Sequence, residues 1–519
     1  MDDTPLRPLA PLLKGLATTR VPELLVGEVR DDSRLVQPGD VFVAVPGTRE
    51  DGRKFVADAL ARGAKVIVSD ATGAARDAGE AAAAAAGAVF VHVPSAREAL
   101  GHLAARRYGA AERLRLLAVT GTNGKTTTTY VVESILKAAG RVPGVLGTVA
   151  YRYAGHTEPA PLTTPGALLL HASLARMAEA GCTDVVMEAS SIALHQHRLA
   201  GCTFAVGALT NVTQDHLDYH GTMEAYFDAK ARLFEDLLGD EGVGVVFADR
   251  DDGQRMARRI RGRVLTLGTD PKPAGADLWV GPRRLDGGGL SAELHTPLGR
   301  VELRARLVGD YNLANVVLAA GMAFAADVPL DALAAGVAAL PGVPGRLEVV
   351  ENTAGVLCVV DYAHTPDALE RALSVLRPLT RGRLLVVFGC GGDRDPGKRP
   401  LMGESAARLA DVAIVTSDNP RTEDPMRILE MIVDGVLQAK VPERRPDDVR
   451  AGATGFCVAP DRRAAIGLAV QAARAGDTLL IAGKGHEDYQ IVGTQKLPFD
   501  DRAEATAAFL SRPAPGVPS

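Results

Sequence analysis

Beyond residue 110, seven short apolar segments are each followed at once by a polar or glycine-rich motif. The clearest segment is residues 114–119 (LRLLAV), which leads directly into residues 120–127 (TGTNGKTT). Short apolar runs of this kind, with helical stretches between them, are typical of strands buried in a parallel sheet. In open α/β sheets, ligands bind beyond the carboxyl ends of the strands. The pattern therefore predicts two parallel sheets that each carry a site at that edge.

The strand-like runs fall into two series with a break between them. The runs are residues 114–119, 184–187, 204–209 and 242–247, then residues 356–360, 384–388, 412–416 and 478–482. A cluster of turn-forming residues, LPGVPG at 340–345, separates the two series. Because 519 residues correspond to about three domains, we predict an α/β protein with domains at 1–108, 109–342 and 343–519.

Charge and cysteine content exclude several classes of protein. The 58 Lys and Arg residues are outnumbered by 63 Asp and Glu residues, so the chain lacks the basic excess of a nucleic-acid binder. The first residues, MDD, lack the pattern of a secretion signal, and the apolar run at 316–326 is too short to span a bilayer. The five scattered cysteines form no CxxC pair. We therefore expect a cytoplasmic protein with reduced thiols and no membrane insertion.

The most legible motif is Gly121-x-x-Gly124-Lys125-Thr126, placed between a strand and a helical stretch at 130–139. Glycines let backbone N–H groups surround a phosphate, and the N-terminus of the following helix favours negative charge. Lys125 can reach the β- and γ-phosphates of ATP, and the Thr126 hydroxyl can bind Mg²⁺. The common phosphate loop has four residues between its glycines, whereas this one has two. A glycine-rich turn with a chance lysine is the alternative.

Three further residues of the same region bear on a metal site. Glu188 and His216 both follow strand ends of the predicted central sheet, where they could bind Mg²⁺. A helix-terminal charge and a capped core histidine are the alternatives for these two residues. Lys230 lies in a helical pattern at 225–234, and composition alone predicts an ordinary surface lysine there.

These motifs, in this order, resemble the Mur ligase family, and within it the diaminopimelate-adding type. The resemblance extends from Asp32-Ser33-Arg34 to the GKGHEDYQ motif at 483–490, nearly the whole chain. It implies an N-terminal α/β domain that binds UDP, a central parallel-sheet ATPase domain with the phosphate loop, and a C-terminal Rossmann-like domain for an amino acid. It also implies an ATP-dependent amide ligase of peptidoglycan precursor synthesis that acts through an acyl phosphate, with Mg²⁺, as a monomer.

The resemblance assigns residues to ATP and to the metal. Lys230 matches the family's carbamylated lysine, so that CO₂ would convert it into an anion beside Mg²⁺, and Lys125, Glu188 and His216 would join it in catalysis. The residues assigned to ATP are Gly121, Thr122, Asn123, Gly124, Lys125, Thr126, Thr127, Asn312, Asn315, Arg346 and Asp361, and those assigned to the metal are Thr126, Glu188, His216 and the Lys230 carbamate. Helix capping is the alternative for the two asparagines.

The other two substrates are assigned in the same way. Ser33, Thr163, Thr164, Ser190, Gln196 and Arg198 look like contacts to a UDP-N-acetylmuramoyl-dipeptide, and the turn at 47–52 looks like a uridine-binding element. Asp418-Asn419-Pro420-Arg421 is the form seen in members that add meso-diaminopimelate, with Arg394, Gly483 and Glu487 as the remaining contacts. Diaminopimelate differs from lysine by a second carboxylate, which a guanidinium binds bidentately. A surface ion pair of Arg421 with Glu423 or Asp424 is the alternative.

Three other classes of protein remain as alternatives. A folylpolyglutamate-synthetase-like ligase would share the ATP loop but lack the first domain and the motif at 418–421. A phosphate-loop motor or transport ATPase would need a water-positioning glutamate and no amino-acid site. A nucleotide-binding regulator could keep the glycines and lose Glu188, His216 and Lys230.

Overall fold

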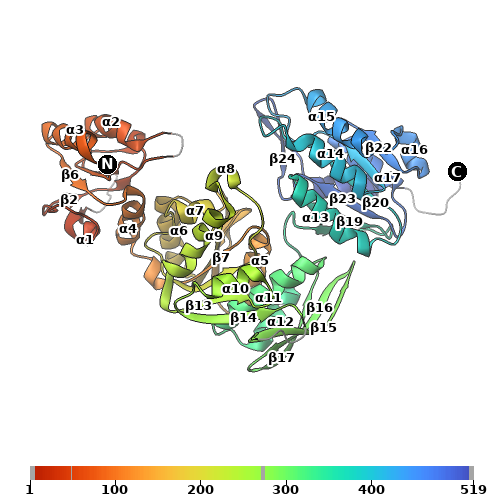
Figure 1. Cartoon of the computed structure of the whole chain (residues 1–519), viewed down its shortest axis with the longest axis horizontal. Coiled ribbons are helices and arrows are strands. Elements are labelled where there is room, and N and C mark those ends of the chain that lie inside the picture. Colours follow the sequence, from red (N-terminus) through yellow and green to blue (C-terminus); the bar gives the residue numbers. More distant parts are fainter. Residues whose placement is uncertain (1–5, 48–49, 271–274, 513–519) are drawn as a thin grey trace. The chain divides into compact units, whose positions relative to one another are not determined.

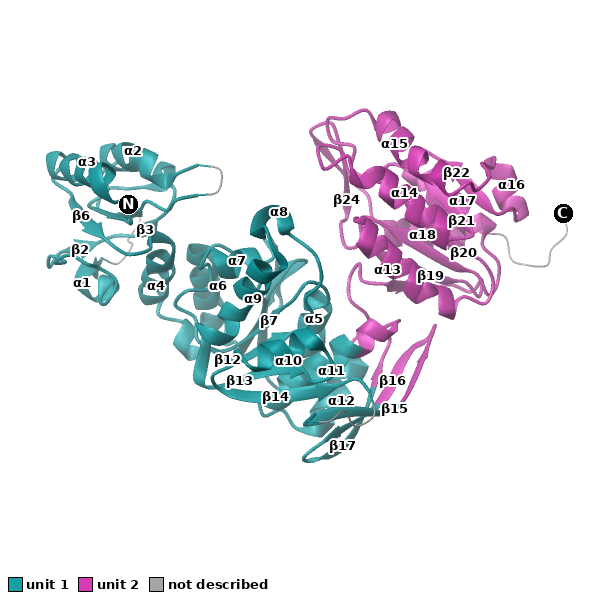
Figure 2. Ribbon diagram, in the orientation of Figure 1, with its two compact units in different colours: residues 1–282, 293–303, 314–339 teal, residues 283–292, 304–313, 340–519 magenta. Residues whose placement is uncertain are grey.

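The computed structural model describes residues 6–47, 50–270 and 275–512. The chain forms two compact units, coloured separately in Figure 2. The first unit contains residues 1–282, 293–303 and 314–339, and the second contains residues 283–292, 304–313 and 340–519. Within the described ranges, no helix is long and apolar enough to cross a bilayer.

The first unit begins with a small α/β layer built on a four-stranded parallel sheet of order β3-β4-β5-β6. Buried leucines and valines from α1, α4 and the strands fill one side of this sheet. The elements are β1 (Arg7–Pro8), α1 (Leu9–Leu13), β2 (Leu25–Val26), β3 (Val29–Arg30), η1 (Ser33–Leu35), β4 (Val41–Val43), η2 (Gly52–Phe55), α2 (Val56–Ala61), β5 (Val66–Ser69), α3 (Gly73–Ala85), β6 (Val89–His92) and α4 (Ala96–Tyr108). The alanine run at 81–86 thus forms the end of helix α3.

The large sheet has eleven strands, and its core is parallel (Figure 1). Its order is β10-β9-β8-β11-β7-β12-β13-β14-β15-β16-β17, and the strands from β8 to β15 run parallel. Their bounds are β7 (Arg115–Thr120), β8 (Pro143–Leu146), β9 (Ala150–Tyr153), β10 (His156–Pro159), β11 (Asp184–Glu188), β12 (Phe204–Leu209), β13 (Leu238–Phe247), β14 (Arg263–Gly268), β15 (Leu278–Asp286), β16 (Gly289–Thr296) and β17 (Gly299–Ala305). Strand β7, which leads into the glycine-rich loop, therefore lies between β11 and β12, which lead into Glu188 and His216.

Helices connect these strands and bury their apolar faces. They are η3 (Ala111–Arg113), α5 (Lys125–Ala138), α6 (Ala167–Glu179), α7 (Ser191–His195), α8 (Leu217–His220), α9 (Met223–Glu235), α10 (Asp251–Ala257), α11 (Asp310–Ala325) and α12 (Leu330–Ala339). Helix α12 packs closely on α5, because Gly336 leaves no room for a Cβ against the Ile135 backbone. This packing holds the helix that starts at the glycine-rich loop.

The second unit contains a six-stranded sheet of order β18-β19-β23-β20-β21-β22, parallel except for β18. Its strands are β18 (Glu348–Val350), β19 (Leu357–Asp361), β20 (Leu384–Phe388), β21 (Val412–Val415), β22 (Gly455–Val458) and β23 (Thr478–Ala482), followed by the hairpin β24 (Tyr489–Val492) and β25 (Gln495–Pro498). Its helices are α13 (Pro366–Leu376), η4 (Arg377–Leu379), α14 (Lys398–Leu409), α15 (Pro425–Gln438), α16 (Pro446–Ala451), α17 (Arg462–Ala472) and α18 (Asp501–Leu510).

Alternation along the strands explains why helices cover both faces of this sheet. In β20, Leu384, Val386 and Phe388 join a core with α13, α14 and α15, whereas Leu385 and Val387 join a second core with α17 and α18. A parallel strand buried on both faces needs apolar residues at every position, as this segment has. The α/β fold with parallel sheets predicted from the sequence is confirmed.

Helices α14 and α15 cross at two glycines, which gives a test of this packing. A Cβ on Gly435 would collide with the Pro400 carbonyl, and one on Gly403 would collide with the Ile432 carbonyl. We expect Gly435→Ala to lower the free energy of unfolding by about 1–3 kcal/mol, measured by chemical denaturation. The control is Gly467→Ala in α17, where nothing lies within 4 Å of the new methyl group. This control is expected to stabilise the protein by about 0.5–1 kcal/mol, because alanine favours helix; equal effects would contradict the close crossing.

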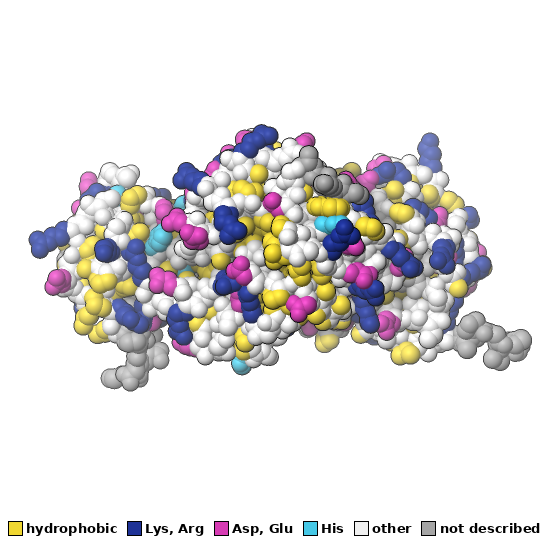
Figure 3. All heavy atoms as spheres, turned by 90° about the horizontal axis from the view of Figure 1, so that it is seen from below, with side chains coloured by type: hydrophobic (Ala, Val, Ile, Leu, Met, Phe, Trp, Pro, Cys, Tyr) yellow, Lys and Arg dark blue, Asp and Glu magenta, His cyan; other side chains and the backbone are white. Residues whose placement is uncertain are grey.

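The surface carries charges of both signs. On the face shown in Figure 3, Lys and Arg side chains lie among Asp and Glu side chains, in keeping with a net charge of −5.

Candidate active site

The glycine-rich loop joins β7 to α5 as the sequence predicts, and its backbone requires the glycines. Gly121 and Gly124 have φ angles of 141° and 89°, which only glycine adopts readily. A Cβ at Gly121 would also collide with the Thr210 side chain, and one at Gly124 with the Asn315 side chain. Helix α5 therefore begins with its N–H groups beside a loop that has no side chains in the way, which is the geometry that binds phosphate.

Neighbouring segments hold this loop in place. The Thr122 N–H donates to the Asn211 carbonyl at 2.8 Å, and the Asn211 side chain accepts from Asn123 N–H at 3.2 Å and donates to the Asn123 carbonyl at 3.1 Å. The Thr122 hydroxyl contacts both the Thr213 carbonyl and the Tyr226 hydroxyl at 3.1 Å. Asn211, which the sequence analysis did not single out, thus fixes the loop from the end of β12.

Lys125 folds back over the loop that precedes it. Its Nζ donates to the carbonyls of Gly121 at 2.8 Å and Thr122 at 2.9 Å. The ammonium therefore lies over the space between the glycines, where it could contact a bound phosphate. Asn315, close to Gly124, stands one helical turn after Asn312 in α11, and the Asn312 side chain donates to the Val308 carbonyl at 2.7 Å. Thr127, the other residue assigned to ATP here, is buried in the first turn of α5.

Thr126, in the first turn of α5, meets Glu188, the last residue of β11. The Thr126 hydroxyl donates to Glu188 Oε2 at 3.1 Å, and the Glu188 side chain is buried. Thr148 contributes two more hydrogen bonds, from its N–H to Oε1 at 2.8 Å and from its hydroxyl to Oε2 at 2.9 Å. These hydrogen bonds hold the carboxylate in one orientation. A hydroxyl and a fixed carboxylate beside a phosphate loop are ligands that suit Mg²⁺.

The expectation of a surface lysine at position 230 is wrong. The Lys230 side chain is 1% exposed, with Nζ 4.1 Å from the centroid of the Tyr226 ring. Burial lowers the pKa of Lys230 well below its usual value, and the charge of Lys125 lowers it further. The helical pattern around this lysine did not reveal its burial, because α9 turns this face toward the glycine-rich loop, as the contact of Tyr226 with Thr122 shows.

A buried amine with a lowered pKa suits carbamylation. The neutral amine is the form that attacks CO₂, and the product, a carbamate, carries a negative charge in place of the ammonium's positive charge. His216 also lies near Tyr226, with ring centroids 6.3 Å apart, but its side chain is about half exposed. Its ring nitrogen is 3.6 Å from Asp215. In the described residues, no three His, Cys, Asp or Glu side chains converge on one metal position.

Except for Ser33, the residues assigned to the UDP substrate form one hydrogen-bonded group next to Glu188. The Thr164 hydroxyl donates to the Glu188 carbonyl at 2.6 Å and accepts from the Ser190 N–H at 3.0 Å. Arg198 donates to the Thr164 carbonyl at 3.1 Å and to Gln196 Oε1 at 2.8 Å. The group continues to Thr163, whose hydroxyl lies 3.1 Å from that of Thr148, and to Tyr219, which accepts from Gln196.

Ser33 lies apart from this group, in the small N-terminal sheet. It is buried at the start of η1, after Asp32, whose side chain caps that turn through the Arg34 N–H. In the neighbouring turn, Gly52 packs so closely on the Val45 backbone that it leaves no room for a Cβ. Thr48 and Arg49 of this predicted uridine-binding turn lie outside the described residues.

In the second unit, Arg346 lies two residues before strand β18, and Asp361 is the last residue of the neighbouring strand β19. The guanidinium of Arg346 lies 5.2 Å from the centroid of the Tyr362 ring, and its Nε is buried without a hydrogen-bond partner. Asp361 accepts from the Leu347 N–H at 2.8 Å. Desolvation raises the pKa of Asp361, and the nearby Arg346 offsets part of that rise. An arginine donor without a partner is suited to receive an anion.

The motif at 418–421 follows strand β21 and meets the loop after β23. Asn419 donates to Glu487 Oε2 at 2.9 Å, and a Cβ on Gly483 would lie 2.8 Å from the Asp418 carboxylate. Burial raises the pKa of Glu487, although the hydrogen bond from Asn419 opposes the rise. The structure therefore brings Asp418, Asn419, Gly483 and Glu487 together.

Arg421 adopts a left-handed backbone conformation (φ 51°), rare for a residue other than glycine. Its guanidinium donates to the Gly392 carbonyl at 2.8 Å. The alternative of a surface ion pair is not what the structure shows, because Glu423 is held by Arg399 at 2.8 Å and Asp424 caps α15. Arg394 is exposed in the same glycine loop, with its Cγ 3.8 Å from the Cβ position of Gly391. Pro420 lies between Asn419 and Arg421, and its carbonyl packs against Gly392.

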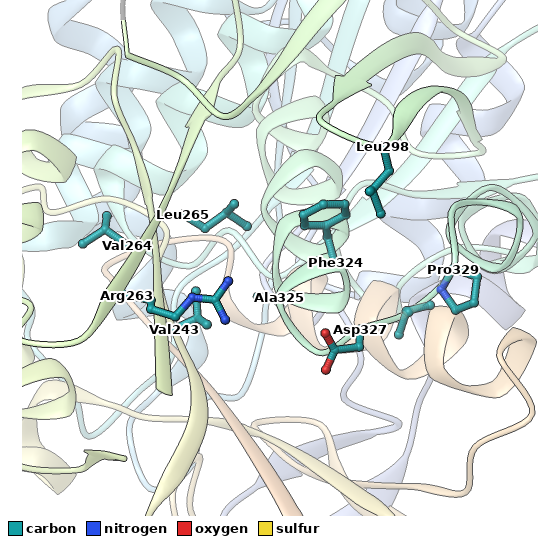
Figure 4. Close-up of a pocket in the computed structure, with 10 residues that line it drawn as sticks. Val243, Arg263, Val264, Leu265, Leu298, Phe324, Ala325, Asp327 and Pro329 are labelled. Atoms are coloured by element: carbon teal, nitrogen blue, oxygen red, sulfur yellow. The ribbon is translucent and has the colours of Figure 1, made fainter. Parts of the chain in front are cut away.

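A cavity of about 310 Å³ in the first unit is separate from these residues. Arg263, Phe324 and Asp327 are among its lining side chains (Figure 4). Arg263 begins strand β14, so the cavity lies at the amino ends of the parallel strands, whereas the predicted site residues follow the carboxyl ends. None of the residues that line the cavity belongs to the predicted site.

Comparison with known proteins agrees with the family resemblance. Residues 26–108, 119–323 and 345–485 match the Mur ligase family catalytic domain, the Mur ligase middle domain, and the Mur ligase glutamate ligase domain, respectively. The chain is 44% identical to a UDP-N-acetylmuramoyl-L-alanyl-D-glutamate–2,6-diaminopimelate ligase of Gloeobacter violaceus, over 97% of both chains. It is 46% identical to the protein of that name from Thermosynechococcus vestitus, over 94% of both chains.

Solved structures give the same result for the fold. A structure of a UDP-N-acetylmuramoyl-L-alanyl-D-glutamate–2,6-diaminopimelate ligase superposes with a TM-score of 0.70 and 33% identity, over 98% of this chain and 99% of that one. A folylpolyglutamate synthase from Mycobacterium tuberculosis shares the fold, with a TM-score of 0.58, at 18% identity over 80% of this chain and 96% of that one. On this sequence identity and coverage, the chain belongs to the Mur ligase family.

Proposed function

We propose that this chain joins meso-2,6-diaminopimelate to the D-glutamyl γ-carboxylate of UDP-N-acetylmuramoyl-L-alanyl-D-glutamate, with ATP as the source of energy. The relatives at 44% and 46% identity carry this activity in their names. The observation that carries the proposal within this chain is the position of Arg421. Its backbone is in the left-handed conformation, and its guanidinium donates to the Gly392 carbonyl of the glycine loop. Asn419, two residues earlier, donates to Glu487. A guanidinium and a carboxylate in one site suit an amino acid that has a carboxylate and an ammonium at its far end.

The reaction must first make a carboxylate reactive. The γ-carboxylate attacks the γ-phosphate of ATP, forms an acyl phosphate and releases ADP. The amino group of diaminopimelate then attacks the acyl carbon, forms the amide and expels phosphate. Catalysis of the first step consists of positioning and charge neutralisation. Lys125 and the first N–H groups of α5 would bind the phosphates, together with Asn315.

Mg²⁺ would neutralise charge on the transferred phosphoryl group. Thr126 and Glu188 would hold it, with a carbamate on Lys230 and with His216 as further ligands. Their fit to the metal is supported by the Thr126–Glu188 hydrogen bond and by the burial of Lys230. The three hydrogen bonds hold the Glu188 carboxylate in one position, next to the Thr126 hydroxyl.

The peptide substrate would bind beside this carboxylate. Thr164 is hydrogen-bonded to both Ser190 and the Glu188 carbonyl, so a ligand that contacts Thr164 would lie next to the proposed metal. Arg198 would offer positive charge to the anionic UDP-muramoyl group, with Thr163 and Gln196 as polar contacts. Ser33 would contribute from the N-terminal sheet.

We also propose the three domains 1–108, 109–342 and 343–519 as binding UDP substrate, ATP and diaminopimelate, respectively. A cytoplasmic monomer is proposed with them. Its support is that all five cysteines are buried and unpaired, and that ATP and nucleotide-linked precursors are its substrates.

Replacement of Arg421 by alanine tests the assignment of the amino-acid site. We expect the preference for meso-diaminopimelate over lysine, measured as the ratio of kcat/KM values, to fall about 10- to 100-fold. The reason is that lysine lacks the second carboxylate that the guanidinium would bind. Arg427→Ala, an exposed arginine in α15, serves as the control and should leave the ratio as it is. An unchanged ratio in Arg421→Ala would show that another residue selects the substrate.

A further inference from the structure

Lys484 is completely buried in the second unit, with its ammonium among three oxygen atoms. Nζ lies 2.8 Å from Asn419 Oδ1, 2.8 Å from the Tyr489 carbonyl and 3.1 Å from Asp418 Oδ1. Two of the three hydrogens of the ammonium are donated to Asn419 and Tyr489, and Asp418 is the ion-pair partner of its charge. Lys484 is therefore placed to hold other residues rather than to contact a substrate itself.

The first consequence concerns the orientation of Asn419. Its Oδ1 accepts from Lys484 and also from the Ile491 N–H at 2.9 Å. With its oxygen held by two donors, the amide must direct Nδ2 the other way, where it donates to Glu487 at 2.9 Å. The position of the Glu487 carboxylate thus depends on Lys484 through one side chain.

The second consequence concerns Arg421. By holding the Tyr489 carbonyl, Lys484 ties down the start of strand β24. The same strand accepts from the Arg421 N–H at the Ile491 carbonyl, 3.1 Å away, and the Gly493 N–H donates back to the Arg421 carbonyl at 2.7 Å. These two bonds enclose the residue whose backbone is in the left-handed conformation. Lys484 therefore connects the backbone that carries Arg421 to the side chain that holds Glu487.

We propose that Lys484 is a positioning residue that sets the spacing between Glu487 and Arg421, and so the fit of an amino acid whose far end bears both an ammonium and a carboxylate. This inference rests on the proposed function, because it concerns how the same site recognises diaminopimelate.

The positive charge of Lys484 has a separate, measurable effect. It lowers the pKa of Glu487, opposing the rise that burial causes. Two other charges act on Glu487: Asp418 raises its pKa, and Arg421 lowers it. Arg462, which forms an ion pair with Asp501, also interacts electrostatically with Asp418 and Glu487. Removal of the Lys484 charge should raise the pKa of Glu487 further. Binding of the ammonium needs an ionised Glu487. In a variant without the Lys484 charge, Glu487 would take up a proton at a higher pH than in the parent, so binding would weaken at a higher pH than in the parent.

Lys484→Met tests the proposal in the full-length protein, since it keeps the volume and removes the charge. We expect KM for meso-diaminopimelate to rise about 10- to 100-fold, with KM for ATP and for the UDP substrate within about twofold of the parent. The acid limb of kcat/KM for diaminopimelate should move to higher pH. A purely structural role would affect all three substrates alike and leave that limb where it is, and this outcome would overturn the proposal.

A second variant guards against poor folding of the first. Lys484→Gln removes the charge but keeps a shorter side chain with two N–H donors, so it should show a smaller rise in KM and the same shift of the acid limb. Lys440→Met, an exposed lysine after α15, is the control and should match the parent in every constant. If the parent itself does not ligate diaminopimelate, the proposed function fails and this inference fails with it. If the parent is active and both Lys484 variants match it, the role of Lys484 alone is wrong.

Discussion

Lys125→Ala should abolish most ATP-dependent ligation, with a fall in kcat of about 10²- to 10³-fold. The side chain is held over its own loop by the carbonyls of Gly121 and Thr122, where a phosphate would displace these contacts. Removing it takes away a positive charge that would act on the phosphoryl group as it is transferred. The measurement is the steady-state rate of tripeptide product formation at saturating ATP.

Lys137→Ala is the matched control for this variant. Lys137 lies on the same helix, α5, in its last turn, where it is 62% exposed and pairs with Glu133. Glu133 is buried but keeps Arg152 as a second partner at 2.5 Å, so the control should ligate at the parent rate. If Lys125→Ala ligates near the parent rate too, the glycine-rich loop is not the phosphate site.

The second large effect is expected at Lys230. Lys230→Met preserves the volume of a side chain that is 1% exposed, yet cannot form a carbamate. We expect kcat to fall about 10²- to 10³-fold, because the site would lose an anion that supports Mg²⁺. The parent should lose activity in CO₂-depleted buffer and regain it when bicarbonate is added, since the lowered pKa of Lys230 leaves a neutral amine able to react.

The variant itself provides the control for the bicarbonate experiment. Lys230→Met should respond to neither depletion nor addition of bicarbonate, and native mass spectrometry should find one extra CO₂ on the parent and none on the variant. A parent that is fully active without CO₂ and carries no added mass would contradict the carbamate and leave Lys230 as a buried lysine.

The strands and the loops that follow them could be predicted from the sequence because both are local features. Residues 204–209, 384–388 and 478–482 match β12, β20 and β23 residue for residue. The meeting of Thr126 with Glu188 follows from the same reasoning, since β7 and β11 pair in parallel and end at one edge. The strands β15, β16 and β17 were not predicted, although burial alternates along β17 as it does in a strand with one exposed face.

Residues that act through tertiary contacts could not be found in this way. Lys230 looks like a surface lysine in its helix, and only the family resemblance singled it out. Thr148 and Asn211 are ordinary polar residues after strands until the structure shows that they hold Glu188 and the glycine-rich loop. Lys484 lies inside a motif that the sequence made conspicuous, but it is buried against Asn419, which lies 65 residues earlier in the chain. No pattern in a single sequence records such contacts.

The most direct test of the account is a ligation assay with purified protein, ATP, Mg²⁺ and UDP-N-acetylmuramoyl-L-alanyl-D-glutamate. Meso-diaminopimelate, lysine and ornithine are supplied separately, and the labelled tripeptide product is measured for each. The account predicts product with diaminopimelate and a rate at least about tenfold lower with the other two, the discrimination expected from one charged hydrogen-bonding partner. Equal rates with all three, or faster ligation of lysine, would contradict it.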